Sequence, residues 1–192
     1  MKSFGEWRAA GSIGKRNNGV GAADLKKIIV LFFLFLIGAG ICFAADPAEG
    51  FWLSVDEKTH EVTAGWHIYQ EGTTLLGKMM SMSAYPKTMR AGRCKDSYPG
   101  FPIAGKVNQL FVIGTPWIFG LSSEKTGEWS GGYVINPEDG KIYKCKIIYR
   151  AADGKKYKTD VLEMRGEIGL GIGRSQFWQK SDSETAGSLG PQ

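Results

Sequence analysis

The chain has 192 residues, 43% of them hydrophobic, and a formal net charge of +5 at pH 7. Most of this charge lies in residues 1–44, which leaves 18 basic and 17 acidic residues for the other 148. A nearly neutral remainder excludes the basic surface that binding to nucleic acid requires, and its length suits one domain with its own core.

Residues 25–44 have the pattern of a secretory signal peptide. Lys26 and Lys27 precede sixteen uncharged residues that end at Phe43, and two alanines follow. A basic start, an apolar middle and a small-residue cleavage site are typical of such a signal, whereas a membrane-spanning helix needs about 20 apolar residues. We therefore expect cleavage and a periplasmic or secreted protein. An uncleaved segment, the alternative, would be its only attachment to a membrane.

Residues 1–24 precede this signal and show no hydrophobic periodicity. Signal peptides are about 15–30 residues long, so one that began at Met1 would be unusually long. We infer that translation starts at Leu25, from an alternative start codon. A precursor whose N-terminal sequence begins at Met1 would contradict this inference.

Period-two alternation recurs along the rest of the chain and predicts β-strands with one buried and one exposed face. Residues 161–168 alternate apolar and charged positions, and turn residues such as Gly72 and Gly140 lie between the strands. Strands at this spacing indicate an antiparallel barrel or sandwich. The predicted strands are 51–56, 62–70, 74–82, 116–122, 128–135, 141–150, 158–168 and 173–180.

One long connection, residues 83–115, separates the third and fourth strands. Loops longer than about 12–15 residues are usually functional or contain local structure, so we expect a short helix or a flap across one barrel mouth. At the other end of the domain, residues 181–192 are small and polar. This composition predicts a disordered tail.

Two cysteines follow the signal, Cys94 in the connection and Cys145 in the sixth strand. An oxidising compartment permits one disulfide between them, and two buried thiols are the alternative. A bridge would fix the connection against the sixth strand. Without it, we expect the connection to be a mobile flap.

The sequence contains no motif for a catalytic, metal or cofactor site. His60 and His67 have no third ligand nearby, and no serine lies in a nucleophile elbow. The glycines between 166 and 173 are followed by a strand and no helix, so a dinucleotide site is excluded and strand bends explain them better. A carboxylate pair leaves no local signature, so a hydrolase stays the third alternative.

Several motifs together resemble the DUF2147 family of exported bacterial proteins. They cover residues 49–180, and the most specific are W-x-G-G…P-x-x-G-K-x-Y-x-C and the terminal G-R-x-Q-x-W. The resemblance implies structural roles for Gly50, Trp52, Trp129, Gly131, Gly132, Pro137, Gly140, Gly166, Gly173, Arg174 and Trp178. Family members often have a cysteine pair in the long connection, where this chain has only Cys94.

The Gly50-Phe-Trp52 motif and Arg174 in the last strand are similar to the lipocalin arrangement. This likeness implies an eight-stranded, calycin-like barrel, closed at one end by the guanidinium of Arg174 stacked on Trp52. Such a contact would tie the first strand to the last.

We expect a non-enzymatic protein that binds a small apolar or amphipathic molecule or serves the cell envelope. The predicted ligand contacts are Trp66, His67, Trp117 and Tyr143. The alternative is an interaction module that presents residues 83–115 to an envelope protein. A barrel filled by Trp66, Met80 and Met164 would favour interaction, and an open apolar cavity would favour ligand binding.

Overall fold

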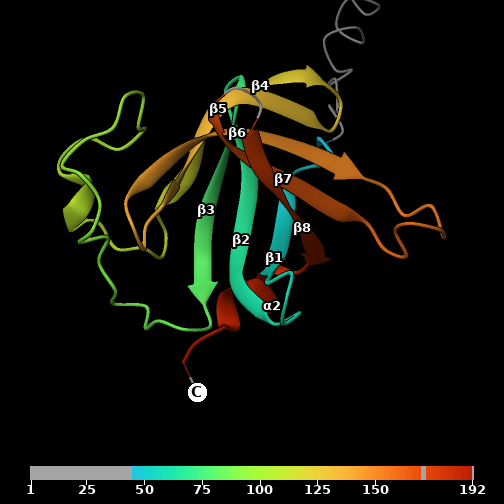
Figure 1. The fold of residues 1–192 in the computed structure, drawn as a ribbon, viewed down its shortest axis with the longest axis horizontal. Coiled ribbons are helices and arrows are strands. Elements are labelled where there is room, and N and C mark those ends of the chain that lie inside the picture. Colours follow the sequence, from blue (N-terminus) through green and yellow to red (C-terminus); the bar gives the residue numbers. More distant parts are fainter. Residues whose placement is uncertain (1–44, 170–171, 192) are drawn as a thin grey trace, which may run out of the picture. The chain divides into compact units, whose positions relative to one another are not determined.

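The computed structural model describes residues 45–169 and 172–191 (Figure 1). In this part of the chain eight antiparallel strands pair in chain order and form a closed barrel, because β1 pairs with both β2 and β8. The strands are β1 (Gly50–Val55), β2 (Val62–Glu71), β3 (Thr74–Met82), β4 (Pro116–Lys125), β5 (Glu128–Asn136), β6 (Lys141–Arg150), β7 (Val161–Gly169) and β8 (Ile172–Ser181). The predicted all-β, eight-stranded, antiparallel barrel is confirmed. The largest boundary differences are three residues, at the end of β4 and at the start of β7.

The predicted leader, 1–24, and the predicted signal peptide, 25–44, lie outside the described residues. Within the residues that are described, no helix has the length and apolar character needed to cross a membrane.

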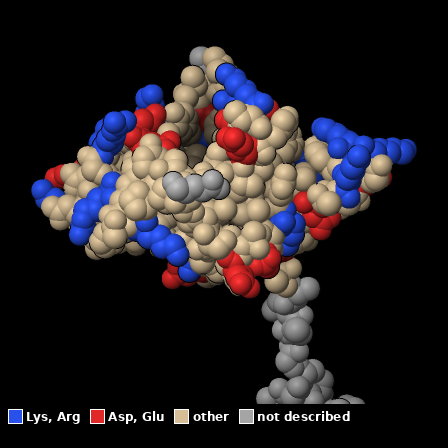
Figure 2. Space-filling model, turned by 90° about the horizontal axis from the view of Figure 1, so that it is seen from below, with Lys and Arg blue, Asp and Glu red and all other residues tan. Residues whose placement is uncertain are grey.

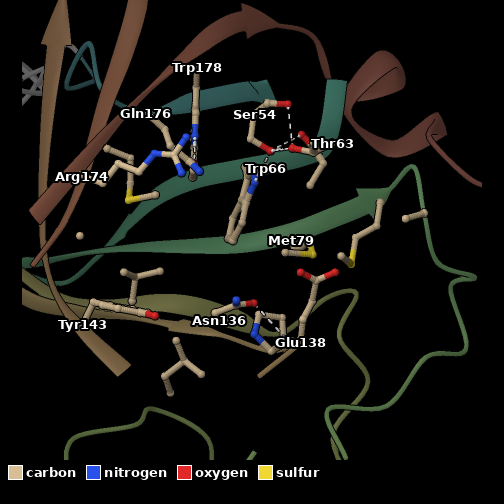
Figure 3. A pocket seen from close by; sticks show the side chains of 18 of the residues that line it. Ser54, Thr63, Trp66, Met79, Asn136, Glu138, Tyr143, Arg174, Gln176 and Trp178 are labelled. Atoms are coloured by element: carbon tan, nitrogen blue, oxygen red, sulfur yellow. Dashed lines mark hydrogen bonds between the residues drawn. The ribbon is translucent and has the colours of Figure 1, made fainter. Parts of the chain in front are cut away.

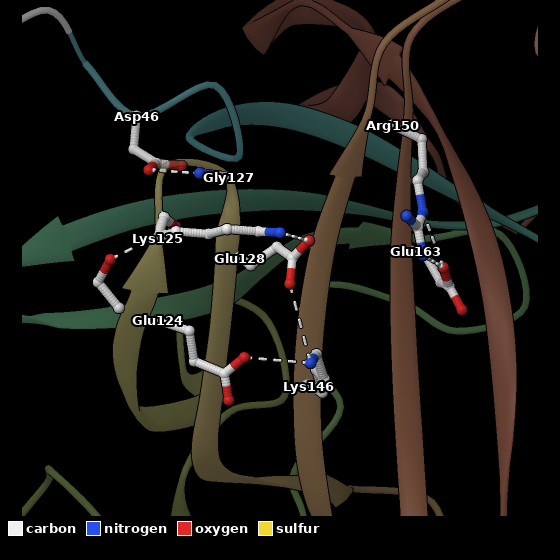
Figure 4. Close-up of polar contacts among 9 residues, drawn as sticks. Asp46, Glu124, Lys125, Gly127, Glu128, Lys146, Arg150 and Glu163 are labelled. Atoms are coloured by element: carbon white, nitrogen blue, oxygen red, sulfur yellow. Dashed lines mark hydrogen bonds and ion pairs between the residues drawn. The ribbon is translucent and has the colours of Figure 1, made fainter.

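One end of the barrel is closed by residues 46–49, immediately before β1. The Asp46 carboxylate accepts hydrogen bonds of 2.9 Å from the backbone N–H of Gly127, in the β4–β5 turn, and from that of Ala48 (Figure 4). Ala48 is fully buried, and its carbonyl accepts the indole N–H of Trp52 at 3.0 Å. The segment before the first strand is therefore an integral part of the closed end.

The cation that lies over Trp52 at this end is Lys180. Its Nζ is 4.3 Å from the centre of the indole ring, and the two residues face each other across β1 and β8. Arg174 is six residues earlier in β8, about 20 Å along the strand, and pairs with Glu57 at 2.8 Å. The predicted contact between Trp52 and Arg174 is therefore wrong. The cation–π contact that links the first strand to the last is made instead by Lys180.

The connection between β3 and β4 packs on the outer side of the barrel. It contains the expected short helix, η1 (Val107–Gln109), and the buried side chains of Ala91 and Val112. The carbonyl of Val112 accepts the indole N–H of Trp117 at 2.8 Å. The connection is thus anchored by a small core of its own and is not a flap across the mouth. Its exposed large hydrophobic side chains are Tyr85 and Phe111.

Cys94 and Cys145 are both free and buried, so the disulfide alternative is wrong. Cys94 lies against Gly140, in the turn where β6 begins, and Cys145 is five residues further along that strand. Five strand residues span about 16 Å, far beyond the 7 Å that a disulfide allows between Cα atoms. Burial raises the pKa of both thiols.

The tail differs from the disorder expected for residues 181–192, because Ser183–Ser188 form helix α2. Asp182 caps the helix by accepting the backbone N–H of Thr185 at 2.8 Å. Ala186 is fully buried, and its carbonyl accepts the hydroxyl of Ser81 at 2.6 Å. Gly65 on β2 makes room for this contact, since a Cβ there would lie 1.9 Å from the Ala186 oxygen. The docking surface is contributed by distant strands, so local composition could not reveal it.

Candidate functional site

The barrel contains a cavity of about 560 Å³ that opens at the end away from residues 46–49. This volume is in the range of small-molecule sites, roughly 300–1,000 Å³. β4 contributes no lining residue, and the connection contributes only its first two residues. The lining residues are Ser54, Thr63, Ala64, Trp66, Met79, Met82, Ser83, Ala84, Val134, Ile135, Asn136, Pro137, Glu138, Tyr143, Met164, Gly166, Arg174, Gln176 and Trp178 (Figure 3).

Two stacked indoles form the main apolar wall of the cavity. The ring centres of Trp66 and Trp178 are 4.9 Å apart, and the rings are inclined by 20°. Met79, on the neighbouring strand β3, lies beside Trp66, and Tyr143 lies across from the two indoles in Figure 3. Offset stacking of this kind adds about 0.5–1.5 kcal/mol to the burial of the rings, so the wall is well held before any ligand binds.

Both indole N–H groups of this wall are bound to neighbouring side chains. The Trp66 Nε1–H donates to Ser54 Oγ at 3.3 Å, and the Ser54 hydroxyl is also 2.9 Å from that of Thr63. The Trp178 Nε1–H donates to Gln176 Oε1 at 3.1 Å (Figure 3). The indoles therefore present only apolar ring surface to the cavity.

The charged lining residues of the cavity are Arg174, from β8, and Glu138, from the β5–β6 turn. Arg174 donates from Nε and Nη2 to the Glu57 carboxylate at 3.2 and 2.8 Å, which raises the pKa of Arg174. The Arg174 and Glu57 side chains are 63% and 40% exposed. Such an exposed ion pair contributes little to stability. Arg174 can therefore contact a ligand at little energetic cost.

The outer surface has no strong charge of one sign on the face that Figure 2 presents. Lys and Arg side chains alternate there with Asp and Glu side chains. This mixture agrees with the nearly neutral charge of residues 45–192.

The structure brings two of the four predicted ligand contacts, Trp66 and Tyr143, into the cavity. His67 follows Trp66 in β2 and so faces outward, where its ring lies 4.5 Å from that of Phe51. Partial burial lowers the pKa of His67. Trp117 is fully buried beneath the connection, with Phe101 5.9 Å away. Strict alternation along each strand would have distinguished the two residues that face the cavity from the two that face outward.

Sequence reasoning missed Met79 and Gln176 as cavity residues. A β-bulge between Gly65 and Trp66 changes the register, so that Trp66 pairs with Met79. Met79 therefore lines the cavity in place of the expected Met80. Gln176 could have been found, because it lies between Arg174 and Trp178 on the same face of β8.

The residues with predicted structural roles occupy three kinds of position. Trp52, Trp129 and Trp178 are buried in the core. Pro137, Gly166 and Arg174 line the cavity. Gly50, Gly131 and Gly140 have positive φ angles, and a Cβ at Gly132 or Gly173 would collide with backbone atoms.

Comparison with known proteins gives one family and one similar fold. Residues 50–180 match the sequence profile of the family described as "Uncharacterized protein conserved in bacteria (DUF2147)". A solved structure, described as "Protein HP1028 from the human pathogen Helicobacter pylori belongs to the lipocalin family", is similar with a TM-score of 0.55. The two chains are 13% identical, and the likeness covers 72% of this chain and 85% of that one. At this identity the likeness establishes the lipocalin-like fold alone. No curated protein matches.

Proposed function

Because the chain belongs to the DUF2147 family and its lipocalin-like barrel holds an open cavity, we propose that the protein binds one small apolar or amphipathic molecule. The cavity is the observation that carries this proposal. Its walls are mostly apolar, and a few polar groups lie at the mouth, as in typical small-molecule sites. A filled barrel would have favoured the interaction alternative.

We propose binding without catalysis. The described lining residues include no His, Cys, Lys or Asp, and Glu138 is their single carboxylate. The cavity therefore offers neither a nucleophile with an adjacent base nor a pair of carboxylates for glycoside hydrolysis.

A leucine at Gly166 should weaken binding by occupying part of the cavity. Gly166 lines the cavity without a positive φ, and a Cβ there would approach nothing closer than the Tyr143 Cβ at 3.6 Å. Gly166→Leu should therefore fold normally. We expect it to bind the neutral fluorophore N-phenyl-1-naphthylamine at least about tenfold more weakly, a loss of about 1.4 kcal/mol.

The matched control is Gly92→Leu, in the connection and outside the cavity, where a Cβ would have no neighbour within 4 Å. It should bind the fluorophore as the unchanged protein does. Equal binding by both variants would contradict a site in the barrel.

We also propose that the protein is exported to the periplasm or secreted. The signal pattern of residues 25–44 supports this. Cleavage after Ala44 would also leave Asp46, which the closed end of the barrel requires. N-terminal sequencing of protein from the periplasmic fraction or medium should begin at Ala45. An intact chain confined to the cytoplasm would contradict export.

A further inference from the structure

We infer that the polar end of the ligand is an anionic oxygen group, a carboxylate or a phosphoryl group, held at the cavity mouth by Arg174 and Gln176. The inference rests on the proposed binding function and names the chemical class of its ligand. It follows from the donors that the lining leaves without a partner.

The orientation of the Gln176 amide is fixed by its neighbour in β8. An indole N–H can only donate, so the Gln176 atom that lies 3.1 Å from Trp178 Nε1 must be the carbonyl oxygen. The NH₂ group of the same amide then has no acceptor among the described residues. Gln176 therefore offers the cavity a donor and has already used its acceptor.

Asn136, across the cavity, is oriented in the same way. Its side-chain oxygen accepts the backbone N–H of Glu138 at 3.0 Å. Because a backbone N–H is also donor-only, the Asn136 NH₂ group is the part left over, and no described residue accepts from it. Both side-chain amides of the lining, Asn136 and Gln176, thus present donors.

Arg174 adds the positive charge to this set. Its Nε and Nη2 atoms bind Glu57, and Nη1 has no partner among the described residues. Arg174 and Gln176 are two residues apart in β8, so their side chains share one face of the strand and their Cα atoms are about 7 Å apart. Figure 3 shows the two side chains close together beside Trp178. A carboxylate or phosphoryl group accepts hydrogen bonds from a guanidinium and an amide at once.

Glu138 determines on which side of the mouth such a group binds. Figure 3 places its carboxylate across the cavity from Arg174. Repulsion from Glu138 would keep an anion on the β8 side, while the apolar part of the ligand extends along Trp66 and Met79. A cationic ligand would instead favour Glu138, so the charge of the preferred ligand tests the assignment.

The test compares four probes with the same twelve-carbon chain, each displacing N-phenyl-1-naphthylamine below its micelle concentration. They are dodecanoate, dodecyl phosphate, dodecanol and dodecyltrimethylammonium. We expect the two anions to bind at least about tenfold more tightly than the alcohol, and the ammonium probe to bind most weakly. The tighter anion identifies the headgroup as a carboxylate or a phosphoryl group.

Two variants assign the preference to residues. Gln176→Glu keeps the acceptor for Trp178 but replaces the free NH₂ with an oxygen, and Arg174→Gln removes the charge. Each should weaken anion binding about tenfold and leave dodecanol binding within about twofold. The control is Arg150→Gln, which breaks a comparable pair with Glu163, 2.7 Å long, outside the cavity lining (Figure 4). Arg150→Gln should change neither the binding of the anionic probes nor that of dodecanol.

The outcomes test ligand binding and headgroup preference separately. If no probe and no fluorophore binds, the binding function itself is overturned. If the fluorophore binds but all four probes bind equally, or the ammonium probe binds most tightly, the proposed function stands and the anionic headgroup is overturned.

Discussion

Replacing Trp52 with alanine should lower the free energy of unfolding by about 3–5 kcal/mol, as truncation of a large buried aromatic does. Trp52 is fully buried, its ring makes a T-shaped contact with that of Tyr149, and its indole N–H donates to the carbonyl of Ala48. Trp52→Ala would leave a cavity and deprive a buried carbonyl of its donor. Urea unfolding followed by circular dichroism measures the loss.

Two further variants distinguish the cation observed over Trp52 from the one that sequence resemblance implied. Arg174→Ala should leave the free energy of unfolding nearly unchanged, because its pair with Glu57 is exposed. Lys180→Ala removes the cation above the indole and should cost about 0.5–2 kcal/mol. A loss below about 1 kcal/mol for Trp52→Ala, or a larger loss for Arg174→Ala than for Lys180→Ala, would contradict this account.

The strands could be predicted from the sequence because alternation and turn residues are local signals. Residues 74–82 and 141–150 were predicted with their observed bounds. The failures involve contacts between distant segments. The docking of α2 depends on Gly65 and Ser81, more than 100 residues earlier, and no property of residues 181–192 alone encodes it.

The candidate site could be predicted only in part, for a similar reason. Alternation places Trp66 and Tyr143 inside the barrel once one inward residue is known, and the same rule excludes His67. The bulge that brings Met79 inward has no signature in β3 itself. The free donor on Gln176 depends on the position of Trp178 in space, which no sequence pattern specifies.

Replacing Gly140 with alanine should detach the long connection from the barrel. Gly140 has a φ of +70°, and a Cβ there would lie 2.3 Å from the carbonyl oxygen of Arg93 and 3.0 Å from the Cα of Cys94. Its own carbonyl accepts the hydroxyl of Tyr98 at 2.7 Å. Strain and collision together should lower the free energy of unfolding by about 2–4 kcal/mol. Cys94, buried at this contact, should then react with a thiol reagent in the native protein.

The control separates backbone strain from the close approach. Gly100, also in the connection, has a φ of +72°, but a Cβ there would have no neighbour within 4 Å. Gly100→Ala should therefore lower the free energy of unfolding only by the strain of the left-handed backbone conformation, about 1–2 kcal/mol. Cys145, inside the barrel, should stay unreactive in both variants. If Gly140→Ala matched Gly100→Ala in stability and left Cys94 protected, the contact at Gly140 would not be what fastens the connection. The close approach of the Arg93 backbone predicts the opposite, because it depends on the absence of a side chain at Gly140. The hydrogen bond from Tyr98 to the Gly140 carbonyl would be lost when that approach is blocked and the connection moves away.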